Sequence, residues 1–155
     1  MTKIVCLFCF SLLLPALSLA APPQDQWLEK VTKGVEGMKL EKPETARKLL
    51  VYSVTRGYRH GSIPTGKIAM RLLGERTGAF EAVISDDLAN FEPGKIDQFD
   101  AICFLNTTKD VFKPAKDEWN KMNPEQRKAA LAKEMQLQNS FIEYLKSGKG
   151  FVGIH

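Results

Sequence analysis

Four short apolar segments alternate with helix-forming segments, and this alternation constrains the fold more than any other feature of the sequence. The apolar segments are residues 49–54, 80–85, 101–105 and 151–154. Because they are apolar at successive positions, each is expected to be a strand that is buried on both faces. Such strands, when helices separate them, form a parallel sheet covered on both sides. The sequence therefore predicts an open, doubly wound α/β domain with right-handed crossover connections.

Two of the predicted helices have clear boundaries. The first follows Ser62, which can cap it, has Pro64 in its first turn and stops at Gly78. The second begins at Asn123 and ends at Gly148. We expect this second helix to turn five apolar residues toward the core: Leu131, Met135, Phe141, Ile142 and Leu145.

The first 20 residues have the pattern of a secretory signal peptide. Lys3 gives a positive start, residues 4–14 are almost wholly apolar, and residues 18–20 place small side chains where a signal peptidase reads them. The alternative is an uncleaved anchor, but the apolar stretch is short and Pro15 interrupts it. We therefore expect cleavage after Ala20, export to the periplasm or cell exterior, and no membrane segment afterwards.

The cysteine content and the net charge argue against a disulfide-held fold and against a nucleic-acid-binding protein. After cleavage Cys103 is the only cysteine, so no internal disulfide holds the fold, and its place in an apolar run favours a buried side chain over a nucleophile. The formal net charge of +4 is too small to indicate nucleic acid binding. Residues 21–47 are expected to form a leader with a short helix near 27–33, and Trp27 is expected to pack on the domain edge.

Polar residues follow each predicted strand, at the edge where open α/β sheets bind ligands. The two histidines of the chain both fall there, His60 after the first strand and His155 after the fourth. His155 can act as an acid, a base or a metal ligand, or it can simply hydrogen-bond loop backbone. His60 lies before a helix, in a loop suited to a carboxylate, a phosphate or a sugar hydroxyl, and the alternative is a solvated loop. Both histidines are candidate catalytic residues.

Other residues at this edge are candidates for binding a substrate or a metal. Two histidines alone are a weak metal signal, because a catalytic zinc needs three protein ligands and a structural zinc four. Asp86 or Asp87 could be the third ligand of a divalent metal beside His60 and His155, although Asp86 can instead cap the next turn. Ser62 is explained by capping, since no Gly-x-Ser-x-Gly sequence frames it. Four residues could bind a polyol substrate, although the last three are also ordinary turn residues: Arg59, Asn106, Thr107 and Thr108.

Three segments in this order, "GYRHGSIP", "DDLANFEPGKIDQFDAICFLNTT" and "GKGFVGIH", resemble the trehalose-utilisation (ThuA-like) family. That family belongs to the class I glutamine amidotransferase-like superfamily, which has flavodoxin-like folds, and the resemblance covers residues 48–155. It implies that His155 occupies the nucleophile-elbow position where the amidotransferases have their catalytic cysteine. Glutamine hydrolysis is therefore not expected, and a role in sugar utilisation is.

The resemblance also carries expectations about the extent and the function of the chain. Relatives continue beyond the position of His155, so residues 48–155 are expected to be the N-terminal part of a ThuA-like domain. The strand at 151–154 would then be an unprotected edge, and residues 1–155 alone would be poorly soluble or partly unfolded. The segment 109–138 is longer and more charged than the usual link. We expect an exported protein that acts on a sugar or modified glycoside; the alternatives are a non-catalytic carbohydrate-binding module and a scaffold for a partner domain.

Overall fold

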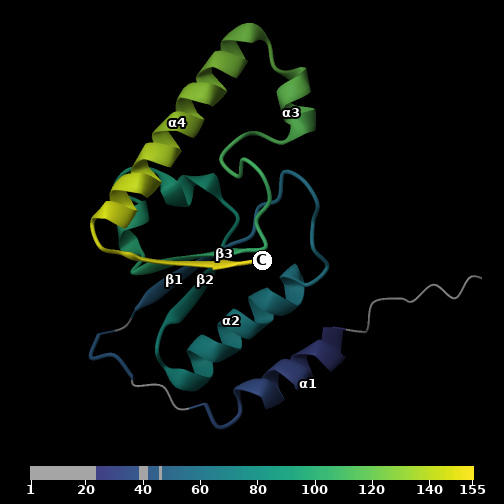
Figure 1. The fold of residues 1–155 in the computed structure, drawn as a ribbon, viewed down its shortest axis with the longest axis vertical. Helices are drawn as coiled ribbons and strands as arrows, with labels where there is room; N and C mark the ends of the chain where they lie inside the picture. Colours follow the sequence, from purple (N-terminus) through teal and green to yellow (C-terminus); the bar gives the residue numbers. More distant parts are fainter. Residues whose placement is uncertain (1–23, 39–41, 46) are drawn as a thin grey trace, which may run out of the picture.

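Four parallel strands form one sheet at the centre of the computed structural model, which describes residues 24–38, 42–45 and 47–155. The strands are β1 (Lys48–Tyr52), β2 (Glu81–Ile84), β3 (Ala101–Leu105) and β4 (Gly150–Ile154), in the order β2-β1-β3-β4 (Figure 1). This confirms the doubly wound, flavodoxin-like α/β fold and the expected edge position of β4. The signal peptide expected at residues 1–20 lies outside the described residues.

The strand order reverses between β1 and β3, and ligands of open α/β sheets bind at such a switch point. Here the pairing of the two strands continues past their ends, because Thr55 and Thr108 form a further parallel bridge. The backbone N–H of Arg56 donates to the carbonyl of Thr108 at 3.0 Å. The loops that follow β1 and β3 are therefore held side by side at the carboxyl edge of the sheet.

The helix α2 (Ile63–Thr77) covers one face of the sheet, where it packs on Leu49, Val51, Cys103 and Leu105. The predicted burial of Cys103 is confirmed, and burial raises the pKa of its thiol. A Cβ atom on Gly66 would lie 2.9 Å from Cδ1 of Leu105, so glycine permits the close approach of α2 to β3. The predicted start and stop of this helix are confirmed. The capping role of Ser62 is wrong, because Ser62 has helical φ and ψ and its side chain makes no cap hydrogen bond.

The opposite face is covered by the long helix α4 (Pro124–Lys146) and by two short 3-10 helices, η1 (Leu88–Phe91) and η2 (Ile96–Gln98). Two buried tyrosines tie this layer to the loops. The hydroxyl of Tyr52 donates to the carbonyl of Val111 at 3.1 Å, and that of Tyr144 to the carbonyl of Phe99 at 3.2 Å. Burial raises the pKa of Tyr144 to about 12.

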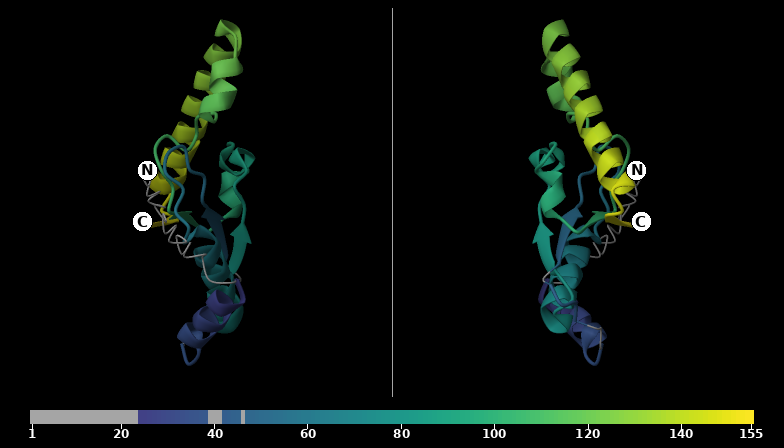
Figure 2. Two further views of the ribbon diagram at one scale, coloured as in Figure 1. Left: turned by 90° about the vertical axis from the view of Figure 1, so that its right-hand side faces the viewer. Right: turned by 90° about the vertical axis from the view of Figure 1, so that its left-hand side faces the viewer.

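The predicted orientation of α4 is largely wrong. Leu131, Met135, Ile142 and Leu145 are exposed, and the residues that face the core are Leu137, Phe141 and Tyr144. The two sets form stripes about 100° apart on the helix, and the sequence alone favoured the more apolar stripe. In addition, α3 (Lys116–Lys121) and the N-terminal half of α4 project beyond the sheet (Figure 2).

The expected leader contains a longer helix than predicted, α1 (Gln24–Val35), which packs against α2 and not on the sheet (Figure 1). Trp27 is half-buried on α1, and the amino group of Lys30 lies 5.0 Å from the centre of its ring. None of the helices within the described ranges combines the length and the hydrophobicity required to cross a bilayer.

Candidate functional site

The structure brings together the two histidines that the sequence placed at the carboxyl edge of the sheet. The ring centroids of His60 and His155 are 5.2 Å apart, with the rings nearly perpendicular. His60 comes from the loop between β1 and α2, and His155 directly follows β4. The exposed ring of Tyr58 contacts the other side of His60 at 4.9 Å. The result is a pair of imidazoles in direct contact, delivered by segments 95 positions apart in the chain.

A cavity of about 380 Å³ adjoins His155, and we call it the histidine cavity. His155 lines it, whereas His60 contacts His155 from outside the lining. Its other polar groups are the hydroxyls of Ser62 and Thr65, at the start of α2, and the amide of Asn106. Among the described residues, no Asp, Glu, Lys or Arg lines it. The remaining wall is apolar or small: Gly66, Ala69, Met70, Leu105 and Ile154.

Asn106 is held in an uncommon backbone conformation at the floor of this cavity. Its φ is 51°, in the left-handed region, and its backbone N–H donates to the carbonyl of Ile154 at 2.7 Å. Residues other than glycine adopt this conformation infrequently, although asparagine tolerates it best. Its side chain is only 7 % exposed, and the hydrogen bonds found among the described residues include none from its amide. The amide is therefore available to a ligand.

The other predicted substrate-binding residues have different positions. Thr108 clamps the two loops, since its hydroxyl accepts from the N–H of Gly57 at 3.2 Å and donates to the carbonyl of Tyr58 at 3.1 Å. Arg59 is exposed and Thr107 is half-buried, and neither lines the histidine cavity. Of the four candidates, the structure places Asn106 alone in the wall of this cavity.

Both carboxylate oxygens of Asp86 are engaged by residues other than the histidines. One carboxylate oxygen accepts from both the N–H and the hydroxyl of Ser53, each at 2.8 Å, and the other accepts from Lys67 at 2.8 Å. Partial burial alone would raise the pKa of Asp86, but the hydrogen bonds from Lys67 and Ser53 outweigh it and hold the pKa below its usual value. The capping alternative is also wrong, because Asp87 caps η1 by accepting from the N–H of Ala89 at 2.9 Å.

The residues of the site do not fit a divalent metal. Within the described ranges, no three side chains among His, Cys, Asp and Glu gather closely enough to hold one. His60 and His155 supply two donors, and Asp86, the expected third, is engaged by Ser53 and Lys67. A catalytic zinc needs three protein ligands, so the described residues supply one donor too few.

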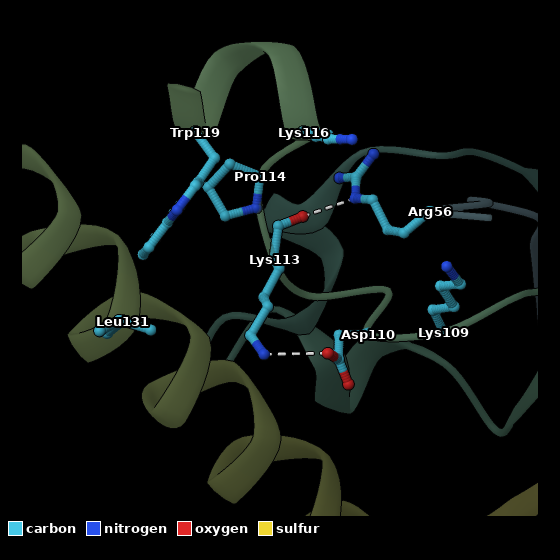
Figure 3. Close-up of a pocket in the computed structure, with 8 residues that line it drawn as sticks. All are labelled: Arg56, Lys109, Asp110, Lys113, Pro114, Lys116, Trp119 and Leu131. Atoms are coloured by element: carbon cyan, nitrogen blue, oxygen red, sulfur yellow. Dashed lines mark hydrogen bonds and ion pairs between the residues drawn. The ribbon is translucent and has the colours of Figure 1, made fainter. Parts of the chain in front are cut away.

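A second cavity of about 400 Å³, which we call the basic cavity, lies beside the segment that the sequence marked as long and charged (Figure 3). Arg56 and a cluster of lysines line it, together with the ring of Trp119. Sequence reasoning missed it, although the lysines that flank Pro114 and precede Trp119 were a signal. Its lining residues are Arg56, Lys109, Asp110, Lys113, Pro114, Lys116, Trp119 and Leu131.

Comparison with known proteins supports the family resemblance. Residues 48–155, well over half of the chain, match the model of the family ThuA, described as trehalose utilisation. Neither a comparison with curated proteins nor one with solved structures returned a match. The all-parallel sheet and the histidine that follows β4 agree with the match. The chain therefore belongs to the ThuA family, whose role is in trehalose utilisation.

Proposed function

We propose that this protein is exported and that it acts on a sugar or a modified glycoside bound in the histidine cavity. The observation that carries the proposal is the contact of His60 with His155, at 5.2 Å, beside a cavity that His155 lines together with the hydroxyls of Ser62 and Thr65 and the amide of Asn106. The family supplies the sugar context, and the geometry suggests which side chains meet the ligand.

The lining of the cavity suits a polyol. A sugar hydroxyl both donates and accepts, and the hydroxyls of Ser62 and Thr65 and the amide of Asn106 can do the same. The apolar wall, which includes Met70 and Leu105, can contact the C–H groups of a pyranose ring. A mostly apolar cavity with a few polar groups is the usual form of a small-molecule site.

The histidine pair supplies an acid and a base. One imidazole can donate a proton to a leaving oxygen while the other accepts one from water or a sugar hydroxyl, a division of labour that contributes about 10²–10⁴-fold to a rate. The carboxylate pair of common glycosidases has no counterpart in the lining of this cavity. Cys103 is buried under α2 and cannot serve as an amidotransferase nucleophile.

The test is turnover and binding of trehalose and other disaccharides by the exported protein and its variants. His155→Ala should lower kcat by at least about 10²-fold while the Kd of the sugar changes little, because an acid/base group acts mainly in the transition state. Tyr58→Phe, next to His60 and exposed, is the matched control and should leave kcat unchanged.

Two results would overturn the proposal. Unchanged turnover in His155→Ala would remove this residue from catalysis. Saturable sugar binding by the wild type with no turnover would favour the alternative, a non-catalytic carbohydrate-binding module. Export is tested separately, since N-terminal sequencing of the secreted protein should begin at Ala21.

A further inference from the structure

The basic cavity carries more positive charge than its own acids neutralise. Lys113 is paired, with Asp110 at 2.9 Å and with Glu134 at 3.8 Å. The other three cations, Arg56, Lys109 and Lys116, take part in none of the ion pairs formed within the described residues. Three cations around one cavity repel each other unless an anion lies between them.

Arg56 is fixed in place and keeps part of its guanidinium for a ligand. Its Nε donates to the carbonyl of Lys113 at 2.6 Å, and its backbone is bonded to Thr108 (Figure 3). The two terminal nitrogens lie at the cavity. A planar guanidinium that is held at one edge can offer parallel N–H groups to a carboxylate, a sulfate or a phosphate.

Lys109 is also held by the backbone. Its φ is 60°, a left-handed conformation that is unfavourable for a lysine. Its side chain runs across Gly57, where a Cβ atom would lie 3.0 Å from Cε and 3.2 Å from Cδ of Lys109. The glycine thus leaves room for the lysine stem, and the amino group is aimed by packing instead of by an ion pair.

The apolar residues of the lining are Trp119, Pro114 and Leu131 (Figure 3). Trp119 is held in place, because the guanidinium of Arg127 lies 5.5 Å from its ring centroid and Arg127 Nε donates to the Trp119 carbonyl at 3.3 Å. A ligand here meets cations on one side and an indole on the other. A saturated ring with an attached anionic group has both kinds of surface.

We propose that the basic cavity is a second binding site, for a carbohydrate that carries a carboxylate, sulfate or phosphate group. The inference that the ligand is a carbohydrate rests on the proposed function. The inference that it is an anion rests on the three unpaired cations alone. The site is separate from the histidine cavity, with which it shares no lining residue.

Titration calorimetry of the exported protein tests this with four probes: glucuronate, glucose 6-sulfate, glucose 6-phosphate and neutral glucose. At least one anionic probe should bind 10-fold or more tightly than glucose, with an affinity that falls as salt rises. The strongest of the three identifies the anionic group. Lys109→Met with Lys116→Met should weaken that binding at least 10-fold. Lys121→Met with Lys128→Met, two exposed lysines outside the cavity, is the charge-matched control.

A pair of glycine variants tests the site without removing a charge. Gly57→Ala should displace the Lys109 side chain and weaken the anionic sugar several-fold. Gly61→Ala has open space around its Cβ position and should bind like the wild type. Equal weakening by both variants would contradict the role given to Lys109.

The outcomes separate this inference from the proposed function. Equal affinity for glucose and for all three anionic sugars would overturn it. Trp119→Ala should weaken glucuronate but not acetate or inorganic phosphate; if it weakens none of them, the carbohydrate part is wrong. His155→Ala should keep full affinity for the anionic sugar, because His155 does not line the basic cavity. A wild-type protein that binds the anionic sugar yet turns over no sugar would contradict the proposed function alone.

Discussion

The loops that follow β1 and β3 contribute residues to both the histidine cavity and the basic cavity, but the two cavities are built in different ways. The histidine cavity is bounded by regular elements: the start of α2 and the ends of β3 and β4. The basic cavity takes seven of its eight lining residues from positions 109–131, most of them in the irregular link between β3 and α4. The first is lined by His155 with hydroxyl and amide groups, and the second has cations at four of its eight lining residues.

This difference indicates how the fold divides its functions. The ends of parallel strands meet at one edge in any open α/β sheet, so the histidine cavity follows from the topology. The basic cavity depends on the sequence of one long connection, the kind of segment that varies most between relatives. Thr108 joins the two, because it clamps the β1 loop to the β3 loop between Asn106 on one side and Lys109 on the other.

The largest expected loss of stability comes from Asp86→Ala. This variant removes hydrogen bonds that support the histidine cavity and not the basic cavity. The N–H and hydroxyl of Ser53, which is fully buried, would lose their acceptor, and Lys67 of α2 would lose its partner. Unsatisfied buried donors cost about 1–3 kcal/mol each, so we expect a loss of about 2–3 kcal/mol in the free energy of unfolding, measured with urea.

Glucuronate binding is the internal control for this variant. Neither Asp86 nor its partners line the basic cavity, so affinity there should be kept under conditions where the variant is folded. An equal loss of ligand affinity at both cavities would show that they form one cooperative unit. It would contradict the inference that the two cavities are supported separately.

Thr108→Val should instead affect both cavities. The isosteric change removes the hydroxyl that accepts from Gly57 and donates to Tyr58, and we expect a cost of about 1–2 kcal/mol. Affinity should fall for trehalose and for glucuronate together, because both loops loosen. Thr107→Val, at a half-buried neighbour that lines neither cavity, is the matched control. A change at one cavity only would show that Thr108 is not the shared clamp.

Much of the histidine side could be predicted from the sequence, because it follows from local patterns. The apolar runs located the strands, and the strand ends located His60, His155 and Asn106. Ser62 was misjudged, since its position before Pro64 suggests a cap that its helical φ and ψ do not allow. Its place in the cavity wall depends on how α2 docks, which no local pattern reveals.

The basic cavity could not be predicted, because its parts meet only through tertiary packing. Arg56 reaches the carbonyl of Lys113 across 57 positions of the chain. The orientation of α4 was missed for a similar reason. Tyr144 is polar at its tip yet buries its ring and hydrogen-bonds Phe99, while the more hydrophobic Ile142 remains exposed. Counting apolar residues along the helix does not separate these two stripes.

A smaller effect is expected from lowering the pH. The pKa of Asp86 is lower in the folded protein than its unfolded value near 3.9, so its ionised form contributes stability above that value. This contribution is lost as pH falls from about 5 through the folded pKa. Because the side chain is 37 % exposed, solvent screens it, and we expect less than about 1 kcal/mol. Urea unfolding at pH 6 and pH 3 should show a smaller difference for Asp86→Asn than for the wild type; an identical difference would contradict this assignment.

The smallest change in stability is expected when glycine replaces the two residues with left-handed φ on either side of Thr108. These variants also test most directly whether the histidine cavity and the basic cavity are separate sites. Asn106→Gly and Lys109→Gly each relieve a positive φ, at 51° and 60° respectively, and each also increases the entropy of the unfolded chain. These effects oppose each other, so we expect the free energy of unfolding to change by no more than about 0.5 kcal/mol.

Each of these two variants should weaken the binding of a different ligand. Asn106→Gly removes one amide from the histidine cavity and should weaken trehalose by about 5- to 10-fold, the value of one hydrogen bond, while glucuronate affinity is kept. Lys109→Gly should weaken glucuronate binding while trehalose affinity is kept. If either variant weakened both ligands equally, the two cavities would share one site, and the separation drawn from their lining residues would be wrong.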